Sequence, residues 1–163
     1  MNNKLKYVIF AVLAVLTALY FFNKYKVAPG INLSQLSLSD LSGQPVKLEE
    51  FKGKKIILTF GASWCGNCIM EMKSLNQIKE SELNDVEIIC ISDEALDVVQ
   101  SFKERKNYPF IFLKMNGSFA SIGIHAIPTT YILNKDFKIK YEKVGEIDWK
   151  DASTVEYMKK LME

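Results

Sequence analysis

The sequence predicts an α/β fold in which helices cover a sheet with parallel strands. Two apolar runs without polar alternation, at residues 55–60 and 86–91, are typical of strands buried on both faces. Helical periodicity follows each run, over residues 66–80 and 93–106. Because strands that alternate with helices pair in parallel through right-handed crossovers, this order predicts βαβ units.

The elements outside these units are predicted from turn residues and apolar patterning. The turn S-G-Q-P at residues 42–45 predicts a hairpin between residues 33–41 and 46–48. Ser92 is the expected N-cap of the second helix, and Trp149 is expected to anchor the last helix. Further strands are expected at residues 110–113, 129–133 and 137–144, and the last helix at residues 149–162.

The composition indicates one globular domain with a tail. The chain has 163 residues, of which 48% are apolar and 25% are charged. Residues 1–26 contain four lysines and no acidic residue, which leaves residues 27–163 with 17 basic and 19 acidic residues, a formal charge of −2. A domain of that charge has no basic footprint, so binding to nucleic acid is excluded.

Residues 1–26 are predicted to be a membrane anchor. Residues 7–22 form an apolar run flanked by lysines, and a helix over this run spans roughly 24 Å of a hydrocarbon core of roughly 30 Å. The flanking lysines can reach the interface. A cleaved signal peptide is the alternative, but no small-x-small cleavage pattern follows the run, which favours a retained anchor. Residues 27–32 then form a stalk, and residues 33–163 form one exported domain.

Cys65 and Cys68 form a C-x-x-C motif at the junction of a strand and a helix, where α/β sheets place their chemistry. Three cysteines are too few for a disulfide framework. They are also too few for a tetrahedral zinc site, which would need a second pair of ligands, because only Cys90 and His125 remain. Ile69 in place of histidine after Cys68 excludes haem attachment. Dithiol redox chemistry remains, because the N-terminus of the helix favours a thiolate. Two structural cysteines are the alternative.

Two motifs resemble those of a known superfamily. The segment F-G-A-S-W-C-G-N-C ends at Cys68, and I-P-T-T-Y-I-L-N follows about sixty residues later. Together they resemble the thioredoxin superfamily, most closely the membrane-anchored TlpA/ResA-like thiol–disulfide oxidoreductases of bacteria, over nearly all of residues 33–163. The resemblance implies a thioredoxin fold with an N-terminal β-hairpin extension. It also implies that Cys65 is the exposed attacking thiol and that Cys68 is the buried resolving thiol.

The resemblance also implies a substrate-binding loop. Ile127 and Pro128 look like the family's cis-proline loop, which packs against the dithiol and presents backbone to an extended substrate. Trp64 is expected to shield the dithiol and to bind substrate together with this loop. Gly61 stands where the superfamily usually has a large aromatic residue, so we expect one wall of the cleft to be open.

Glu71 is the candidate proton acceptor of the dithiol. It lies three residues after Cys68, so both residues share one helix face, and ResA-like proteins carry a glutamate at this offset. A carboxylate partly buried there would have a raised pKa and could accept the proton of Cys68. Thr59 occupies the position where thioredoxin has a buried aspartate. A solvated surface glutamate is the alternative.

The predicted function is thiol–disulfide exchange with protein substrates, as a reductant, through the W-C-G-N-C dithiol. The domain is expected on the extracytoplasmic (periplasmic) side of a bacterial cytoplasmic membrane, anchored by a single helix and supplied with electrons by a membrane thiol donor. No cofactor and no metal is required, because the electrons reside in the cysteine pair. The alternative is a carrier of a metal such as Cu(I) that uses Cys65, Cys68 and His125. Cys90 is expected to be a small buried hydrophobe.

Overall fold

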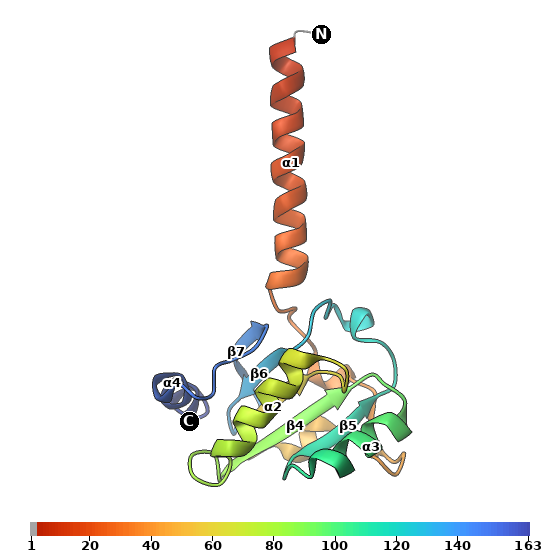
Figure 1. Cartoon of the computed structure of the whole chain (residues 1–163), viewed down its shortest axis with the longest axis vertical. Coiled ribbons are helices and arrows are strands. Elements are labelled where there is room, and N and C mark those ends of the chain that lie inside the picture. The colour runs from red at the N-terminus through yellow and green to blue at the C-terminus, as the bar shows by residue number, and fades with distance from the viewer. Residues whose placement is uncertain (1–2) are drawn as a thin grey trace.

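A mixed sheet of seven strands forms the centre of the domain in the computed structural model, which describes residues 3–163 (Figure 1). The strands are β1 (Leu38–Ser39), β2 (Pro45–Val46), β3 (Lys55–Phe60), β4 (Val86–Ser92), β5 (Ile111–Met115), β6 (Thr129–Leu133) and β7 (Ile139–Val144). The helices are α1 (Asn3–Lys26), α2 (Gly66–Ile78), α3 (Leu96–Lys106) and α4 (Ala152–Leu161), with short 3-10 helices η1 (Leu33–Gln35), η2 (Leu48–Phe51) and η3 (Phe119–Ile122). The predicted α/β fold is therefore confirmed.

The strand order β2-β1-β5-β4-β3-β6-β7 places β3 inside the sheet. β3 pairs in parallel with β4, and β4 pairs in parallel with β5, as the alternation of strands and helices predicts. β6 pairs antiparallel with β3 on its other side. The register sets Thr59 between Cys90 on β4 and Thr130 on β6, so these three residues meet near the carboxyl end of β3.

Apolar side chains bury both faces of the sheet, which explains the uninterrupted apolar runs of the central strands. On one face, Ile57 and Ile88 belong to a core shared with residues of α2, α3 and α4. On the other face, Ile56 and Ile89 belong to a core completed by the segment before β3 and by η3. Figure 1 shows this division, with α2 and α3 in front of the sheet and the orange N-terminal segment behind it.

α1 extends beyond the apolar run on which the anchor prediction rests. Its 24 residues give a length of about 36 Å, enough for a hydrocarbon core of about 30 Å. Within Asn3–Tyr25, a window of 18 residues has a mean hydropathy of 2.2, and the helix is long and apolar enough to cross a membrane. Residues 27–32, which were expected to form a stalk, are partly docked on the domain. Ala28 is buried, and the carbonyl oxygen of Pro29 accepts a 2.7 Å hydrogen bond from the hydroxyl of Tyr131.

Three predicted boundaries are wrong. Ser92 is the last residue of β4 and not a helix cap, and α3 begins three residues after the predicted start, with Ala95 as its N-cap. The last helix begins after Asp151, whose carboxylate accepts hydrogen bonds from the backbone N–H groups of Ser153 and Thr154. The predicted N-terminal hairpin is reduced to β1 and β2, with η1 and η2 on either side of it.

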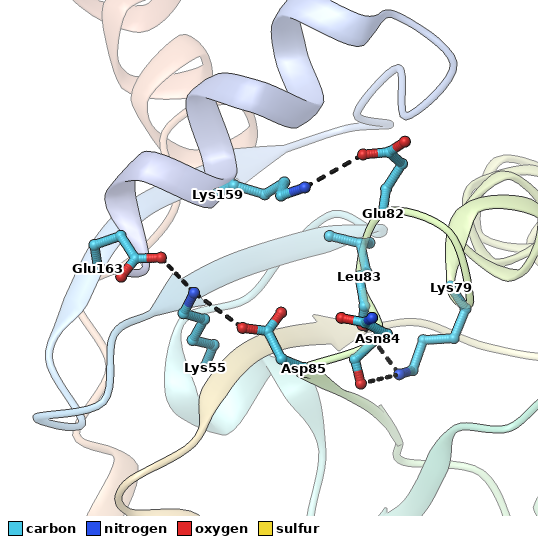
Figure 2. A network of polar contacts seen from close by, with 8 residues as sticks. All are labelled: Lys55, Lys79, Glu82, Leu83, Asn84, Asp85, Lys159 and Glu163. Carbon is cyan, nitrogen blue, oxygen red and sulfur yellow. Dashed lines mark hydrogen bonds and ion pairs between the residues drawn. The ribbon is translucent and has the colours of Figure 1, made fainter.

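The end of the chain is held against the start of β3, far along that strand from the cysteine pair. Lys55 is largely buried, and its ammonium group contacts Glu163 and lies 3.0 Å from Oδ2 of Asp85, as Figure 2 shows. A second ion pair joins α4 to the turn after α2, with 3.2 Å between Nζ of Lys159 and Oε2 of Glu82 (Figure 2). These contacts join the last residue to the sheet and α4 to the turn after α2.

Candidate active site

Cys65 and Cys68 form a disulfide at the N-terminus of α2. β3 ends at Phe60, and the short loop that follows leads into α2 with Cys65 as the N-cap residue. Sγ of Cys65 accepts a 3.2 Å hydrogen bond from the backbone N–H of Cys68. Because the first N–H groups of a helix have no partner within the helix, they can hold a sulfur with negative charge at this position. The local sequence thus builds a site that favours a thiolate on Cys65.

The residues around the disulfide differ strongly in exposure. Cys65 is 7% exposed and Cys68 is 3% exposed, so both residues are buried and Cys65 is the more exposed only by a small margin. Trp64 is 74% exposed and presents most of its indole to solvent beside the pair. An exposed aromatic ring next to a reactive sulfur can cover a peptide that binds there.

The predicted cis-proline loop packs against the disulfide. The peptide bond between Ile127 and Pro128 is cis, and the carbonyl oxygen of Ile127 lies 3.9 Å from Sγ of Cys65. The loop leads directly into β6, which pairs antiparallel with β3. The start of β6 therefore lies beside the end of β3, and the loop and the cysteines lie at the same end of these strands. The fold thus brings Cys65 and Ile127, which are 62 residues apart in the sequence, into contact.

Glu71 is 1% exposed and takes part in a buried polar chain. Its Oε1 accepts a 3.2 Å hydrogen bond from Nε1 of Trp149 and a 3.1 Å hydrogen bond from the hydroxyl of Thr130. Thr130 Oγ1 also lies 3.1 Å from Oγ1 of Thr59. The threonine that replaces the buried aspartate of thioredoxin is therefore linked through Thr130 to the carboxyl group of Glu71.

Burial raises the pKa of Glu71 from 4.5 to about 7, while the hydrogen bonds from Trp149 and Thr130 oppose part of this rise. Its Oε2 is buried and has no hydrogen-bond partner within residues 3–163. A carboxyl group with one free oxygen and a pKa near neutrality can take up and release a proton under physiological conditions. Nothing in the sequence spacing indicated Thr130 or Trp149 as partners, because they lie 59 and 78 residues from Glu71.

Gly61 allows the loop before α2 to approach Cys68 closely. A Cβ atom at Gly61 would lie 3.2 Å from Cβ and 3.3 Å from Sγ of Cys68. Cys68 therefore occupies room that an aromatic side chain at Gly61 would need. Behind this contact lies a cavity of about 20 Å³, which Gly61, Cys68 and Cys90 help to line.

His125 and Cys90 lie apart from any metal-binding cluster. Within residues 3–163, no group of three or more histidine, cysteine, aspartate or glutamate side chains is arranged to hold a metal ion. The ring of His125 faces Tyr25 at the end of α1, with 6.2 Å between the ring centroids. Cys90 is a buried free cysteine on β4, as expected, and burial raises its pKa.

A helix N-terminus that holds a disulfide between closely spaced cysteines, with a cis-proline loop against it, is suited to thiol–disulfide exchange with another molecule. The protein is a thioredoxin-like thiol–disulfide oxidoreductase. The chain belongs to the Redoxin family, which matches residues 26–159.

Relatives and solved structures agree with this assignment. The chain is 29% identical over 146 residues to "Thiol-disulfide oxidoreductase ResA" of Bacillus thuringiensis subsp. konkukian, with 87% of this chain and 83% of that protein covered. It is 27% identical over 130 residues to "Thioredoxin-like protein YneN" of Bacillus subtilis, with 77% and 76% covered. The fold is similar to that of a putative thiol:disulfide interchange protein DsbE from Chlorobium tepidum, with a TM-score of 0.68, 16% identity, and coverage of 83% of this chain and 100% of that one.

Proposed function

We propose that this protein reduces disulfides of protein substrates outside the cytoplasm, tethered by α1 to a bacterial cytoplasmic membrane. The observation that carries the proposal is the buried carboxyl group of Glu71 beside the W-C-G-N-C pair. It lies one helical turn after Cys68, with a free oxygen and a pKa of about 7. The assignment as a thioredoxin-like oxidoreductase supplies the class of reaction, and Glu71 supplies a reason for its direction.

The reaction begins at Cys65. Its thiolate attacks one sulfur of the substrate disulfide, a mixed disulfide forms, and the second substrate sulfur leaves as a thiolate that takes up a proton. Cys68 then loses its proton and attacks Sγ of Cys65, which closes the Cys65–Cys68 disulfide and releases the reduced substrate. Two electrons pass from the cysteine pair to the substrate. Glu71 is the group that accepts the proton of Cys68, because it lies on the same helix face and has an oxygen available.

The substrate segment lies along the cis-proline loop in this proposal. The carbonyl oxygen of Ile127, close to Sγ of Cys65, can accept a hydrogen bond from the backbone of an extended peptide. Pro128 has no N–H group of its own and leaves this edge free of a competing donor. Trp64, largely exposed, covers the bound segment from the side of α2.

The negative charge of Glu71 favours the role of reductant. A carboxylate near the dithiol disfavours the thiolate form of either cysteine. The thiolate belongs to the reduced protein, so its loss of stability favours the disulfide and gives the pair a more negative reduction potential. Glu71 in this way opposes the N-terminus of α2, which stabilises the thiolate.

The position of α1 supports an electron donor in the membrane. In Figure 1 the N-terminal end of α2, which carries the cysteine pair, lies at the end of the domain from which α1 rises. The contacts of Pro29 with Tyr131 and of Tyr25 with His125 attach the chain to the domain at this end. A dithiol held close to the membrane surface is accessible to a thiol donor embedded in the membrane.

The reduction potential of the Cys65–Cys68 pair tests the proposed direction. We expect equilibration with glutathione to give a value near that of thioredoxin or the glutaredoxins, between roughly −200 and −270 mV. A value near that of the strong oxidant DsbA, about −120 mV, would contradict the role of reductant. Cys65→Ser, in which the Cys65–Cys68 disulfide cannot form, is the control for this titration and should lack the transition of the pair.

A further inference from the structure

Glu94 is a second carboxylate near the disulfide, and the reaction described above does not use it. It lies between β4 and α3, and its two oxygens accept three hydrogen bonds. Oε2 accepts from the backbone N–H of Ser63 at 2.7 Å and from the hydroxyl of Ser92 at 3.0 Å. Oε1 accepts from the hydroxyl of Ser63 at 2.7 Å. Three hydrogen bonds fix both the position and the orientation of this carboxylate.

Ser63 belongs to the loop that presents the cysteine pair. It precedes Cys65 by two residues and is adjacent to the exposed Trp64. Elsewhere in this loop, Gly61 N–H donates to the carbonyl of Ile91 at 3.0 Å and Cys65 N–H donates to the carbonyl of Ala62 at 3.1 Å. Glu94 holds the middle of the loop through both the backbone and the side chain of Ser63. Because Glu94 lies in the connection between β4 and α3, its hydrogen bonds join the loop to the end of β4.

Glu94 also lines a cavity together with Cys68. Glu94 and Cys68 both line the cavity of about 20 Å³ behind the disulfide. The other walls of this cavity include Met72, Val99 and Phe102, which are apolar and buried. In such surroundings the interaction between two charges is weakened less than it is in water. A negative charge on Glu94 therefore acts on any negative charge that forms on the cysteine pair.

We propose that Glu94 is a positioning residue of the dithiol that has two effects. Its hydrogen bonds to Ser63 hold the loop that carries Trp64 and Cys65, and its charge disfavours the thiolate of the reduced pair. Glu94 forms no bond with substrate and takes no electrons. It favours the disulfide in the internal equilibrium and so strengthens the pair as a reductant. This inference rests on the proposed exchange reaction of Cys65 and Cys68.

The test compares Glu94→Gln, Glu94→Ala and Asp97→Asn in the full-length protein in detergent. Glutamine keeps the size of the side chain and can still bond to Ser63, but it has no charge. We expect Glu94→Gln to shift the equilibrium with glutathione towards the reduced pair by about fivefold, or about 20 mV towards less negative potentials. Glu94→Ala should show the same shift and also react more slowly with a disulfide substrate. Asp97→Asn removes an exposed charge three residues later, in the first turn of α3, and should leave the equilibrium unchanged.

An equilibrium constant of Glu94→Gln equal to that of the unchanged protein would overturn the inference. An equal shift in Asp97→Asn would also overturn it, because the effect would then belong to the net charge of the domain. The same equilibration of the wild-type protein with glutathione distinguishes a failure of this inference from a failure of the proposed function. If its cysteine pair does not equilibrate with glutathione at all, the proposed exchange fails, and if it does, only the role of Glu94 is at issue.

Discussion

The indole of Trp149 donates a hydrogen bond to the carboxyl group of Glu71, which lies 78 residues earlier in the chain, with 3.2 Å between Nε1 and Oε1. Both side chains are buried, at 0% and 1% exposure. A buried carboxyl group is costly when it is ionised, and one hydrogen bond from an indole offsets only part of this cost. Because the burial of Glu71 raises its pKa, the stability of the folded protein depends on pH.

Glu71→Gln should stabilise the oxidised protein at alkaline pH. Because the pKa of Glu71 is raised from 4.5 to about 7, the folded state binds more protons than the unfolded state between these values. The stability of the unchanged protein therefore falls as pH rises through this window, by about 3 kcal/mol for this group. Glutamine does not titrate. Denaturant unfolding of both proteins at pH 5 and pH 8 checks this, and a difference in stability that is independent of pH would contradict it.

Trp149→Phe should destabilise the protein more at pH 8 than at pH 5. The substitution removes the N–H donor to Glu71, and loss of a hydrogen bond to a charged group costs about 1.5–3 kcal/mol. Below pH 5 the carboxyl group is neutral and the loss is smaller, while the cost of the smaller ring is the same at both pH values. The same substitution in the Glu71→Gln background serves as the control and should show no such pH dependence. An equal cost at both pH values with Glu71 present would argue against the charged interaction.

The sequence predicted the parts of the site that depend on neighbouring residues. Cys65 and Cys68 are close in sequence, and the apolar patterns on either side predict the strand and the helix that position them. The partners of Glu71 could not be predicted, because Thr130 and Trp149 reach it through the pairing of β6 with β3 and the packing of the segment before α4. Trp149 was expected only to anchor a helix.

The start of α3 shows why an apparent cap can mislead. Ser92 precedes acidic residues, a pattern typical of a helix N-terminus. In the structure, pairing with Lys114 extends β4 through Ser92, and its hydroxyl donates a hydrogen bond to Glu94. The carboxylate of Glu94 bonds to Ser63 and not to the helix. Contacts with a loop 31 residues away thus outweigh the local preference.

Lys55→Met should destabilise the protein, whereas Lys54→Met should have little effect. Contact with Glu163, and then with Asp85, raises the pKa of Lys55, and Lys55 lowers the pKa of both acids. Methionine keeps the apolar stem and removes the charge. Lys54 is exposed, and its ammonium group lies 3.6 Å from the carboxylate of Glu87. Because solvent screens this ion pair, its removal should cost little stability.

The pH dependence of this effect has a definite sign. The lowered pKa values of Asp85 and Glu163 stabilise the folded state above the pKa values of the unfolded chain, and this contribution is lost as pH falls through the lower values. The cost of Lys55→Met should therefore be present at pH 7 and shrink in acid. Thermal unfolding at pH 7 and pH 3 measures it. An equal loss in Lys54→Met and Lys55→Met would show that burial of the lysine is unimportant.

The domain should be reachable from outside the cytoplasmic membrane. α1 is long and apolar enough to cross it, and we propose that the domain lies on the extracytoplasmic side. After reduction, Cys65 should react with a membrane-impermeant thiol reagent in intact cells whose outer membrane, where present, has been permeabilised. Cys65→Ser is the control for labelling of this residue. Labelling of Cys65 only after lysis would contradict this orientation.

The assignment of roles within the cysteine pair is the central claim, and trapping of a mixed disulfide tests it most directly. Cys68→Ser leaves Cys65 without a resolving thiol, so incubation with a disulfide-containing protein should yield a stable adduct. Peptide mapping should place the adduct on Cys65. Cys65→Ser leaves only Cys68, the less exposed residue of the pair, and should yield little adduct. An adduct on Cys68 in the second variant, with none on Cys65 in the first, would reverse the roles of nucleophile and resolving thiol.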